Sequence, residues 1–288
     1  MPGSPAGPTE ANEELGGRLV HWVRRGSGRP TVLLLGGCGV PSTAWAPLLP
    51  ALDSHQVVQL DRPGLLGTPW PGVLPTLEAE VATLTALIER VGGPVVLVAH
   101  SMAGLHAEAL VRRRPDLVRG LVLVDSSVEW RSARTRTGSR TVERYWLGLA
   151  RLARTALRLP PVQLLGSAVD RLLVTAQSNR RLLDRRPAAA YSVYRNGEAV
   201  ASVIAEQAAY ERQVSELAEL RSASSFPDLA VVVVTAGNRR RWIRKQARLA
   251  GLLGGRQIVA ADAHHLVMMD RPDLIADAVR EVAGLTAS

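Results

Sequence analysis

The order of apolar and polar positions along the chain predicts strands that alternate with helices. Short apolar runs, each closed by turn residues, fit buried strands at 30–35, 56–60, 95–100, 120–125, 229–235 and 257–260. A further run at 19–24 fits an edge strand. Helical spacing of apolar residues predicts helices between several of these runs, one of them beginning at Thr76 and ending before Gly92. Strands and helices that alternate in this way predict the α/β class, with a mostly parallel sheet and helices on both faces.

The alternation stops after Asp125 and resumes at Leu229. The segment between them is rich in Arg, Ala and Leu and contains no clear strand, so we predict a helical insertion that forms a lid, or cap, over 126–226. The α/β core is then built from 18–125 and 227–288. Residues 1–17 are rich in Pro, Gly and Glu, which predicts a disordered tail.

The composition fits a globular enzyme, and the charge raises the question of anionic partners. Hydrophobic residues make up 47% of the chain and charged residues 21%, while the formal net charge is +9. Sixteen arginines stand against nine acidic residues within 126–225. An excess of basic residues favours binding to nucleic acid or to an anionic membrane surface. No nucleic-acid motif is present, so we predict no nucleic-acid partner and keep membrane-surface contact as an alternative.

The single cysteine, Cys38, excludes an internal disulfide. The N-terminal residues lack the apolar run of a signal peptide, and no apolar run reaches the length that spans a membrane. We therefore predict a cytoplasmic protein. Nothing in the sequence indicates an oligomeric state.

A serine follows the apolar run at 95–100, directly before a segment of helical composition. A serine at a sharp turn from strand to helix is a nucleophile elbow, which needs small neighbours because the turn is strained and crowded. Here Ala99 and Ala103 flank Ser101 at the positions where the usual pattern has glycine, and Gly104 follows. A serine hydroxyl also needs a base to take its proton. His264 and His265 come after the last predicted strand, and that loop returns to the same edge of the sheet.

Together these stretches resemble an α/β-hydrolase of the lipase, esterase and epoxide-hydrolase type. The resemblance rests on four stretches in the expected order, namely Leu33–Gly39, Asp61–Gly64, Val98–Gly104 and His265–Pro272.

The resemblance implies a role for individual residues. Ser101 matches the nucleophile, and His265, rather than His264, matches the base. His264 replaces a customary glycine and stays a possible competitor as the base. The oxyanion hole would be formed by the backbone N–H groups of Met102 and Cys38, and the Cys38 thiol has no part in this prediction.

The acid of the triad is the open question. The loop after the seventh strand, where the family commonly has an Asp, contains Asn238 and no carboxylate. Some members take the acid from the end of the sixth strand, where this chain has Asp125. Glu129 is a second candidate, and the absence of an acid is a third.

We therefore predict a serine hydrolase that cleaves a small or medium hydrophobic ester or a related acyl substrate, with no metal and no organic cofactor. One alternative is non-acyl chemistry on the same fold, by a lyase or a cofactor-free oxygenase. Another is a non-catalytic basic protein that binds a partner or a membrane surface through the Arg-rich insertion.

Overall fold

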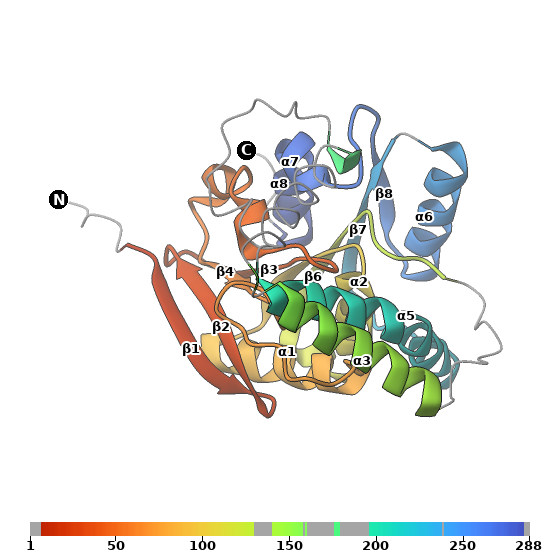
Figure 1. Cartoon of the computed structure of the whole chain (residues 1–288). Helices are drawn as coiled ribbons and strands as arrows, with labels where there is room; N and C mark the ends of the chain where they lie inside the picture. Colours follow the sequence, from red (N-terminus) through yellow and green to blue (C-terminus); the bar gives the residue numbers. More distant parts are fainter. Residues whose placement is uncertain are drawn as a thin grey trace.

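An eight-stranded sheet runs through the molecule in the computed structural model (Figure 1), which describes residues 7–129, 140–157, 159, 176–178, 196–237 and 239–284. The strand order is β1-β2-β4-β3-β5-β6-β7-β8. β1 pairs antiparallel with β2, and β2 with β4, while every other pair is parallel. The strands are β1 (Thr9–Leu15), β2 (Arg18–Arg25), β3 (Val32–Leu35), β4 (Val57–Leu60), β5 (Val95–His100), β6 (Val118–Val124), β7 (Ala230–Ala236) and β8 (Arg256–Ala260). The predicted α/β class with a mostly parallel sheet is confirmed.

Helices cover both faces of this sheet and enclose two apolar layers. One layer packs the sheet against α1 (Leu77–Val91), α2 (Ala103–Arg113), α5 (Gly197–Ala223) and α6 (Arg240–Leu252). The other layer packs it against η1 (Ser42–Trp45), η2 (Leu49–Leu52), α7 (Val267–Asp270) and α8 (Pro272–Val282). A short turn of helix, η3 (Pro115–Leu117), leads into β6. The central parallel strands are therefore buried on both faces, which explains their continuous apolar runs.

Local sequence signals place α1 where the spacing of apolar residues predicts it. The Thr76 side chain accepts a hydrogen bond from the Ala79 N–H at 3.1 Å, so it caps the first turn. Gly92 ends the helix with φ 78, a left-handed conformation that glycine adopts without strain. The segment between β3 and β4 forms two separate short turns of helix, η1 and η2.

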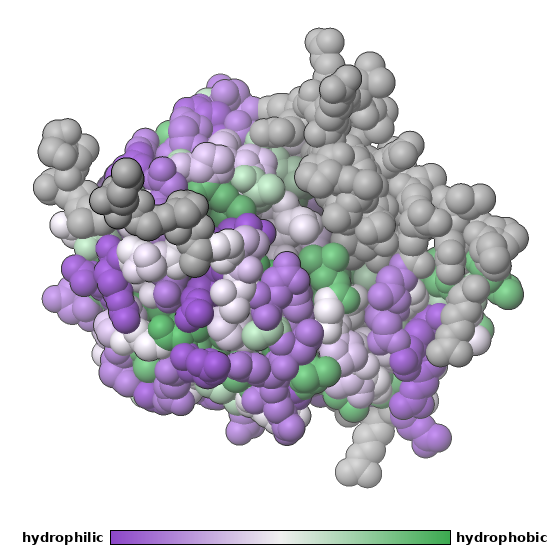
Figure 2. Space-filling model, turned by 90° about the vertical axis from the view of Figure 1, so that its left-hand side faces the viewer, coloured by the Kyte–Doolittle hydropathy of each residue, from purple (hydrophilic) through white to green (hydrophobic). Residues whose placement is uncertain are grey.

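The predicted disordered tail over 1–17 is wrong for the segment Thr9–Leu15. This segment forms β1 and pairs along its whole length with β2, so β2 is an inner strand and β1 is the edge. Glu10 and Glu14 are exposed on β1. Charged side chains of this kind keep an edge strand from pairing with other chains. Figure 2 shows the side of the molecule that carries β1, where apolar patches are small and separated by hydrophilic residues.

The described parts of the insertion between β6 and β7 are mostly helical. α3 (Arg140–Ala156) packs on α5, and they approach closely at Gly197, where an added Cβ would lie 2.4 Å from the Arg154 carbonyl oxygen. Ala150, Ala201 and Ala205 are buried in this contact together with Trp70. Whether the insertion works as a lid stays a prediction. None of the helices in the described ranges is long and apolar enough to cross a membrane.

A buried histidine couples this fold to pH. His106 on α2 is 1% exposed, and its Nε2 lies 2.6 Å from Oε1 of Gln213 on α5. Burial, together with the positive charge of Arg62, lowers the pKa of His106 from 6.5 to about 4. The folded protein therefore holds His106 neutral, whereas the unfolded chain takes up a proton below pH 6.5.

We predict that His106 alone makes the free energy of unfolding fall by about 3 kcal/mol as the pH decreases from 7 to 4. Urea unfolding of the wild type and of His106→Gln at several pH values checks this. Gln keeps a donor for Gln213 and does not titrate, so the variant should lose less stability over this range. An equal pH dependence in the two proteins would contradict the prediction.

Candidate active site

The site is built around a strained turn at Ser101, between β5 and α2. Ser101 has φ 52, a left-handed conformation that costs energy in a residue with a Cβ. Three backbone hydrogen bonds hold the turn. The Ser101 N–H donates to the Val124 carbonyl of β6 at 3.0 Å. The Ser101 carbonyl accepts from the N–H groups of Gly104 and Ser127, each at 3.0 Å. The predicted elbow geometry is therefore present, and it exposes the Ser101 side chain at the end of β5.

Crowding around this turn explains the small residues in the sequence. A Cβ on Gly104 would lie 1.8 Å from the Ser126 hydroxyl oxygen, so glycine is required there. Ala99 and Ala103 are both fully buried, and they stand where the usual pattern has glycine. Alanine is accommodated at positions 99 and 103. The position that requires glycine is 104, one residue later than in the usual pattern.

Three loops bring the predicted nucleophile, base and acid into one chain of hydrogen bonds. The Ser101 hydroxyl and His265 Nε2 are 3.0 Å apart, and His265 Nδ1 lies 2.7 Å from Asp125 Oδ2. Ser101 follows β5, Asp125 follows β6 and His265 lies between β8 and α7. Because the carboxyl ends of parallel strands meet at one edge of the sheet, residues far apart in the sequence are neighbours here.

Of the candidate acids, Asp125 is the carboxylate that contacts His265. Its side chain is 5% exposed, and Oδ1 accepts hydrogen bonds from the Ala236 N–H at 3.0 Å and from the Trp242 indole at 2.6 Å. With Oδ2 on His265, both carboxylate oxygens are engaged. Glu129 instead lies 3.8 Å from the Lys245 ammonium. Asn238 is outside the described residues.

Trp242 is a member of this site that the sequence did not reveal. It stands in the first turn of α6, within an Arg-rich run that reads as a solvated helix face. Its indole reaches Asp125 across 117 residues of sequence. The one available signal is an isolated tryptophan among cations at the start of a helix, and it says nothing about the partner.

The neighbouring histidines have supporting positions. His100 is fully buried, and its Nε2–H donates to the His265 carbonyl at 3.0 Å. Burial lowers the pKa of His100 well below its usual value, and the charge of His265 adds to this, so His100 stays neutral. The His264 N–H donates to Asp270 Oδ2 at 2.9 Å. Of His264 and His265, it is His265 whose ring reaches the serine, in line with what the family resemblance implies.

The loop after β3 lies directly against the serine. A Cβ on Gly37 would be 2.7 Å from the Ser101 Cβ, so the backbone at Gly37 passes at contact distance and Cys38 comes next. Within the described part of the chain, neither the Met102 N–H nor the Cys38 N–H donates to another protein atom. The Met102 N–H also sits at the N-terminal end of α2, where the helix dipole favours negative charge. Neither N–H group is therefore occupied by a backbone acceptor in the described ranges, as the predicted oxyanion role requires.

The residues present fit a site that works through side chains and backbone N–H groups. No cluster of three metal-ligating side chains occurs among the residues that the structure describes.

Comparisons with known proteins identify the family of the chain. A family model described as "Alpha/beta hydrolase family" matches residues 32–278. The chain is 37% identical over 119 residues to lipase LipV from Mycobacterium tuberculosis, covering 41% of this chain and 45% of the lipase. It is 38% identical over 100 residues to the pimeloyl-[acyl-carrier protein] methyl ester esterase of Aromatoleum aromaticum, covering 34% of this chain and 38% of the esterase. Each match spans less than half the length of the curated relative.

Solved structures resemble this fold over nearly the whole chain. Cfl2 from Burkholderia cenocepacia matches with a TM-score of 0.73 and 19% identity, covering 96% of this chain and 95% of that one. A loop variant of the haloalkane dehalogenase DbeA from Bradyrhizobium elkanii matches with a TM-score of 0.67 and 18% identity, covering 97% and 98%. At these identities the likeness establishes the fold and not the reaction. Because the family model matches most of the chain, the protein belongs to the alpha/beta hydrolase family.

Proposed function

We propose that the protein is a serine hydrolase that cleaves an ester or a related acyl substrate through an acyl-enzyme. The observation that carries this proposal is the continuous chain from the Ser101 hydroxyl through His265 to Asp125, at 3.0 and 2.7 Å. A nucleophile, a base and an acid that orients the base are the three groups that acyl transfer of this type needs. The similarity to a lipase and a methyl ester esterase supports the same class of reaction.

In the first half of the reaction, His265 takes the hydroxyl proton as Ser101 attacks the substrate carbonyl. The resulting imidazolium faces the Asp125 carboxylate, which stabilises it and keeps the ring in place. The carbonyl oxygen becomes negatively charged and is held by the N–H groups of Met102 and Cys38. Donors of this kind typically contribute ~3 kcal/mol each to transition-state stabilisation.

The first half ends when His265 gives its proton to the leaving alcohol and the acyl-enzyme forms. In the second half, water enters, His265 accepts a proton from it, and the hydroxide attacks the acyl carbonyl. Collapse of the second tetrahedral intermediate releases the acid and returns the proton to Ser101.

The substrate that we propose is small and hydrophobic. The insertion between β6 and β7 supports this, because α3 exposes the large apolar side chains of Tyr145 and Leu152. α5 also contacts the loop that carries Cys38, which is the position that a lid over the site requires. We also propose that residues 126–226 form a lid over the site and that the protein is cytoplasmic.

A fluorophosphonate probe tests the nucleophile. We predict that the wild type is labelled with one probe per chain, that Ser101→Ala is not labelled, and that His265→Ala is labelled at least about 100 times more slowly because the hydroxyl loses its base. Gel fluorescence and peptide mass spectrometry measure the labelling, and circular dichroism verifies folding. A folded wild type that does not react would favour non-acyl chemistry.

The role of Asp125 is tested by comparing it with the other candidate acid. We predict that Asp125→Asn lowers kcat for a chromogenic ester by about four orders of magnitude, because an amide neither fixes the tautomer of His265 nor stabilises its charge. Glu129→Gln, the matched control, should leave kcat unchanged. The reverse ranking of these two variants would show that the acid is assigned to the wrong residue.

The indole of Trp242 is expected to act through Asp125. Trp242→Phe removes one hydrogen bond to the carboxylate while it keeps most of the packing volume. We predict a fall in kcat of about 10-fold with little change in KM, on the scale of one hydrogen bond to a charged group. Steady-state kinetics with the same ester measures it, and an unchanged kcat would remove Trp242 from the site.

A further inference from the structure

A buried ion pair joins the insertion to the core close to the site. Arg62 follows β4 and Glu206 lies in the middle of α5, and their side chains are 2% and 3% exposed. An Arg62 guanidinium nitrogen is 2.8 Å from Glu206 Oε1. Burying two charges has a large unfavourable desolvation free energy, and the attraction between them offsets little more than this penalty. A hydrophobic pair would serve stability as well, so this pair points to a positional role.

The same face of α5 surrounds the Cys38 side chain. Gln207 Nε2 donates to the Cys38 sulfur at 3.3 Å, and the Val203 carbonyl lies 4.0 Å from it. The Glu206 carboxylate accepts a hydrogen bond from the Gly39 N–H. Residues 203, 206 and 207 share one side of a helix, so they act on this loop together. Burial raises the pKa of the Cys38 thiol well above its usual value, and the charge of Glu206 adds to this, so the thiol stays neutral.

The loop is mostly glycine, and one backbone hydrogen bond of its own, from the Val40 N–H to the Gly37 carbonyl at 3.1 Å, closes its turn. It reads Gly36-Gly37-Cys38-Gly39, so Cys38 supplies its single side chain. Glycine backbones adopt many conformations, and Gly39 is in the left-handed region with φ 66. The contact of Gly37 with Ser101 fixes one end of the Cys38 peptide relative to the nucleophile. The other end, at Cys38 and Gly39, is fixed by α5.

We propose that Glu206 is a positioning residue, which Arg62 holds in place, and that with Gln207 it fixes the Cys38 N–H for the oxyanion. This inference rests on the proposed acyl-transfer function and deepens it, because it makes the insertion part of the catalytic geometry. The oxyanion hole is complete when α5 is docked on the core.

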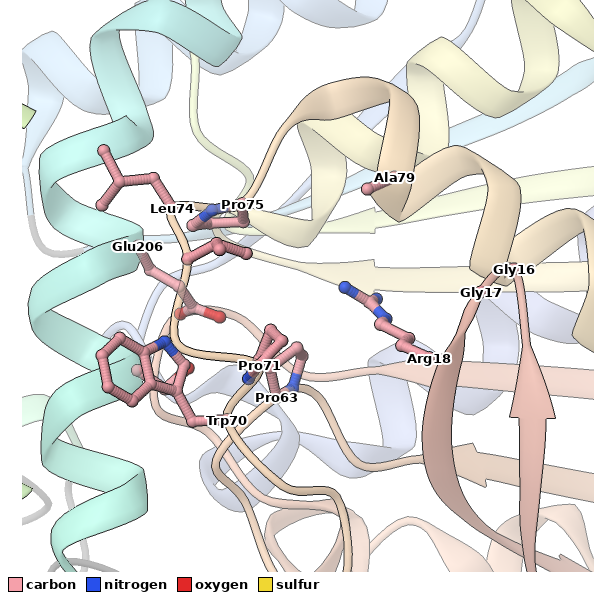
Figure 3. Close-up of a pocket in the computed structure, with 12 residues that line it drawn as sticks. Gly16, Gly17, Arg18, Pro63, Trp70, Pro71, Leu74, Pro75, Ala79 and Glu206 are labelled. Carbon is pink, nitrogen blue, oxygen red and sulfur yellow. The ribbon is translucent and has the colours of Figure 1, made fainter. Parts of the chain in front are cut away.

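The direction of the Glu206 side chain agrees with this role. Figure 3 shows it extending from α5 toward the loop that carries Pro63, the residue after Arg62. On this side the carboxylate also borders a pocket of about 160 Å³. Glu206→Gln keeps the shape of the side chain, so it removes the charge without filling or enlarging this space.

The experiment compares Glu206→Gln, Cys38→Ala and the double variant with the wild type, using a chromogenic ester. The expected result is a fall in kcat of about 10- to 100-fold in each single variant, with KM changed less than about 2-fold, because a displaced donor weakens transition-state binding alone. The double variant should be no slower than the slower single variant, because both changes release the same loop.

Glu216→Gln is the matched control. Glu216 is also a carboxylate on α5 that anchors the helix to the core, through the Leu77 N–H at 3.1 Å, and it does not contact the Cys38 loop. It should leave kcat unchanged. If Glu206→Gln acted through loss of helix docking or stability, Glu216→Gln would lower kcat similarly, the two changes at 206 and 38 would multiply, and the inference would be overturned.

Two failures are distinguishable in this design. A folded wild type that neither hydrolyses esters nor reacts with a fluorophosphonate overturns the proposed function and this inference with it. An active wild type together with a Glu206→Gln variant of normal kcat overturns the positioning role alone.

Gln207→Leu provides an independent check, because it leaves no buried charge unpaired. It should lower kcat about 3- to 10-fold, since one hydrogen bond to the Cys38 sulfur is lost.

Discussion

The left-handed turn at Ser101 is the constraint on which the rest of the site depends. The strained conformation is held by three hydrogen bonds. The Val124 carbonyl of β6 accepts one from the Ser101 N–H, and the Ser101 carbonyl accepts the other two from the N–H groups of Gly104 and Ser127. The turn therefore exists only within a sheet in which β5 and β6 are parallel neighbours in this register. That same arrangement places Asp125, at the end of β6, beside the loop that returns His265 from the last strand. The strained turn and the hydrogen-bond chain thus have one structural origin.

Around Ser101, buried polar groups position Asp125, His265 and the loop that carries Cys38. Trp242 and the Ala236 N–H fix Asp125, His100 holds the backbone of His265, and Glu206 holds the loop of Cys38. Each support comes from a different element, so the geometry of the site requires the whole core and α5 to be folded. An arrangement of this kind suits a reaction in which preorganised donors do most of the catalytic work.

Much of this could be predicted from the sequence, because the signals are local. The apolar run before Ser101, the Thr76 cap and each of the four family stretches are contained within a few consecutive residues, and they indicate the sheet, the elbow and His265. The sequence predicts a tail where β1 lies, because this acidic edge strand lacks an alternation of apolar residues. Trp242 and the Arg62–Glu206 pair could not be found, because their partners lie 117 and 144 residues away in the sequence, and only packing brings them together.

The most direct test of the account is to trap the acyl-enzyme. The protein would be mixed rapidly with a chromogenic short-chain ester, and acid-quenched samples would be examined by intact mass and peptide mass spectrometry. The account predicts a burst of about one alcohol per chain and an acyl group on the peptide that carries Ser101. Ester hydrolysis without an adduct, or an adduct on Cys38 in place of Ser101, would contradict it.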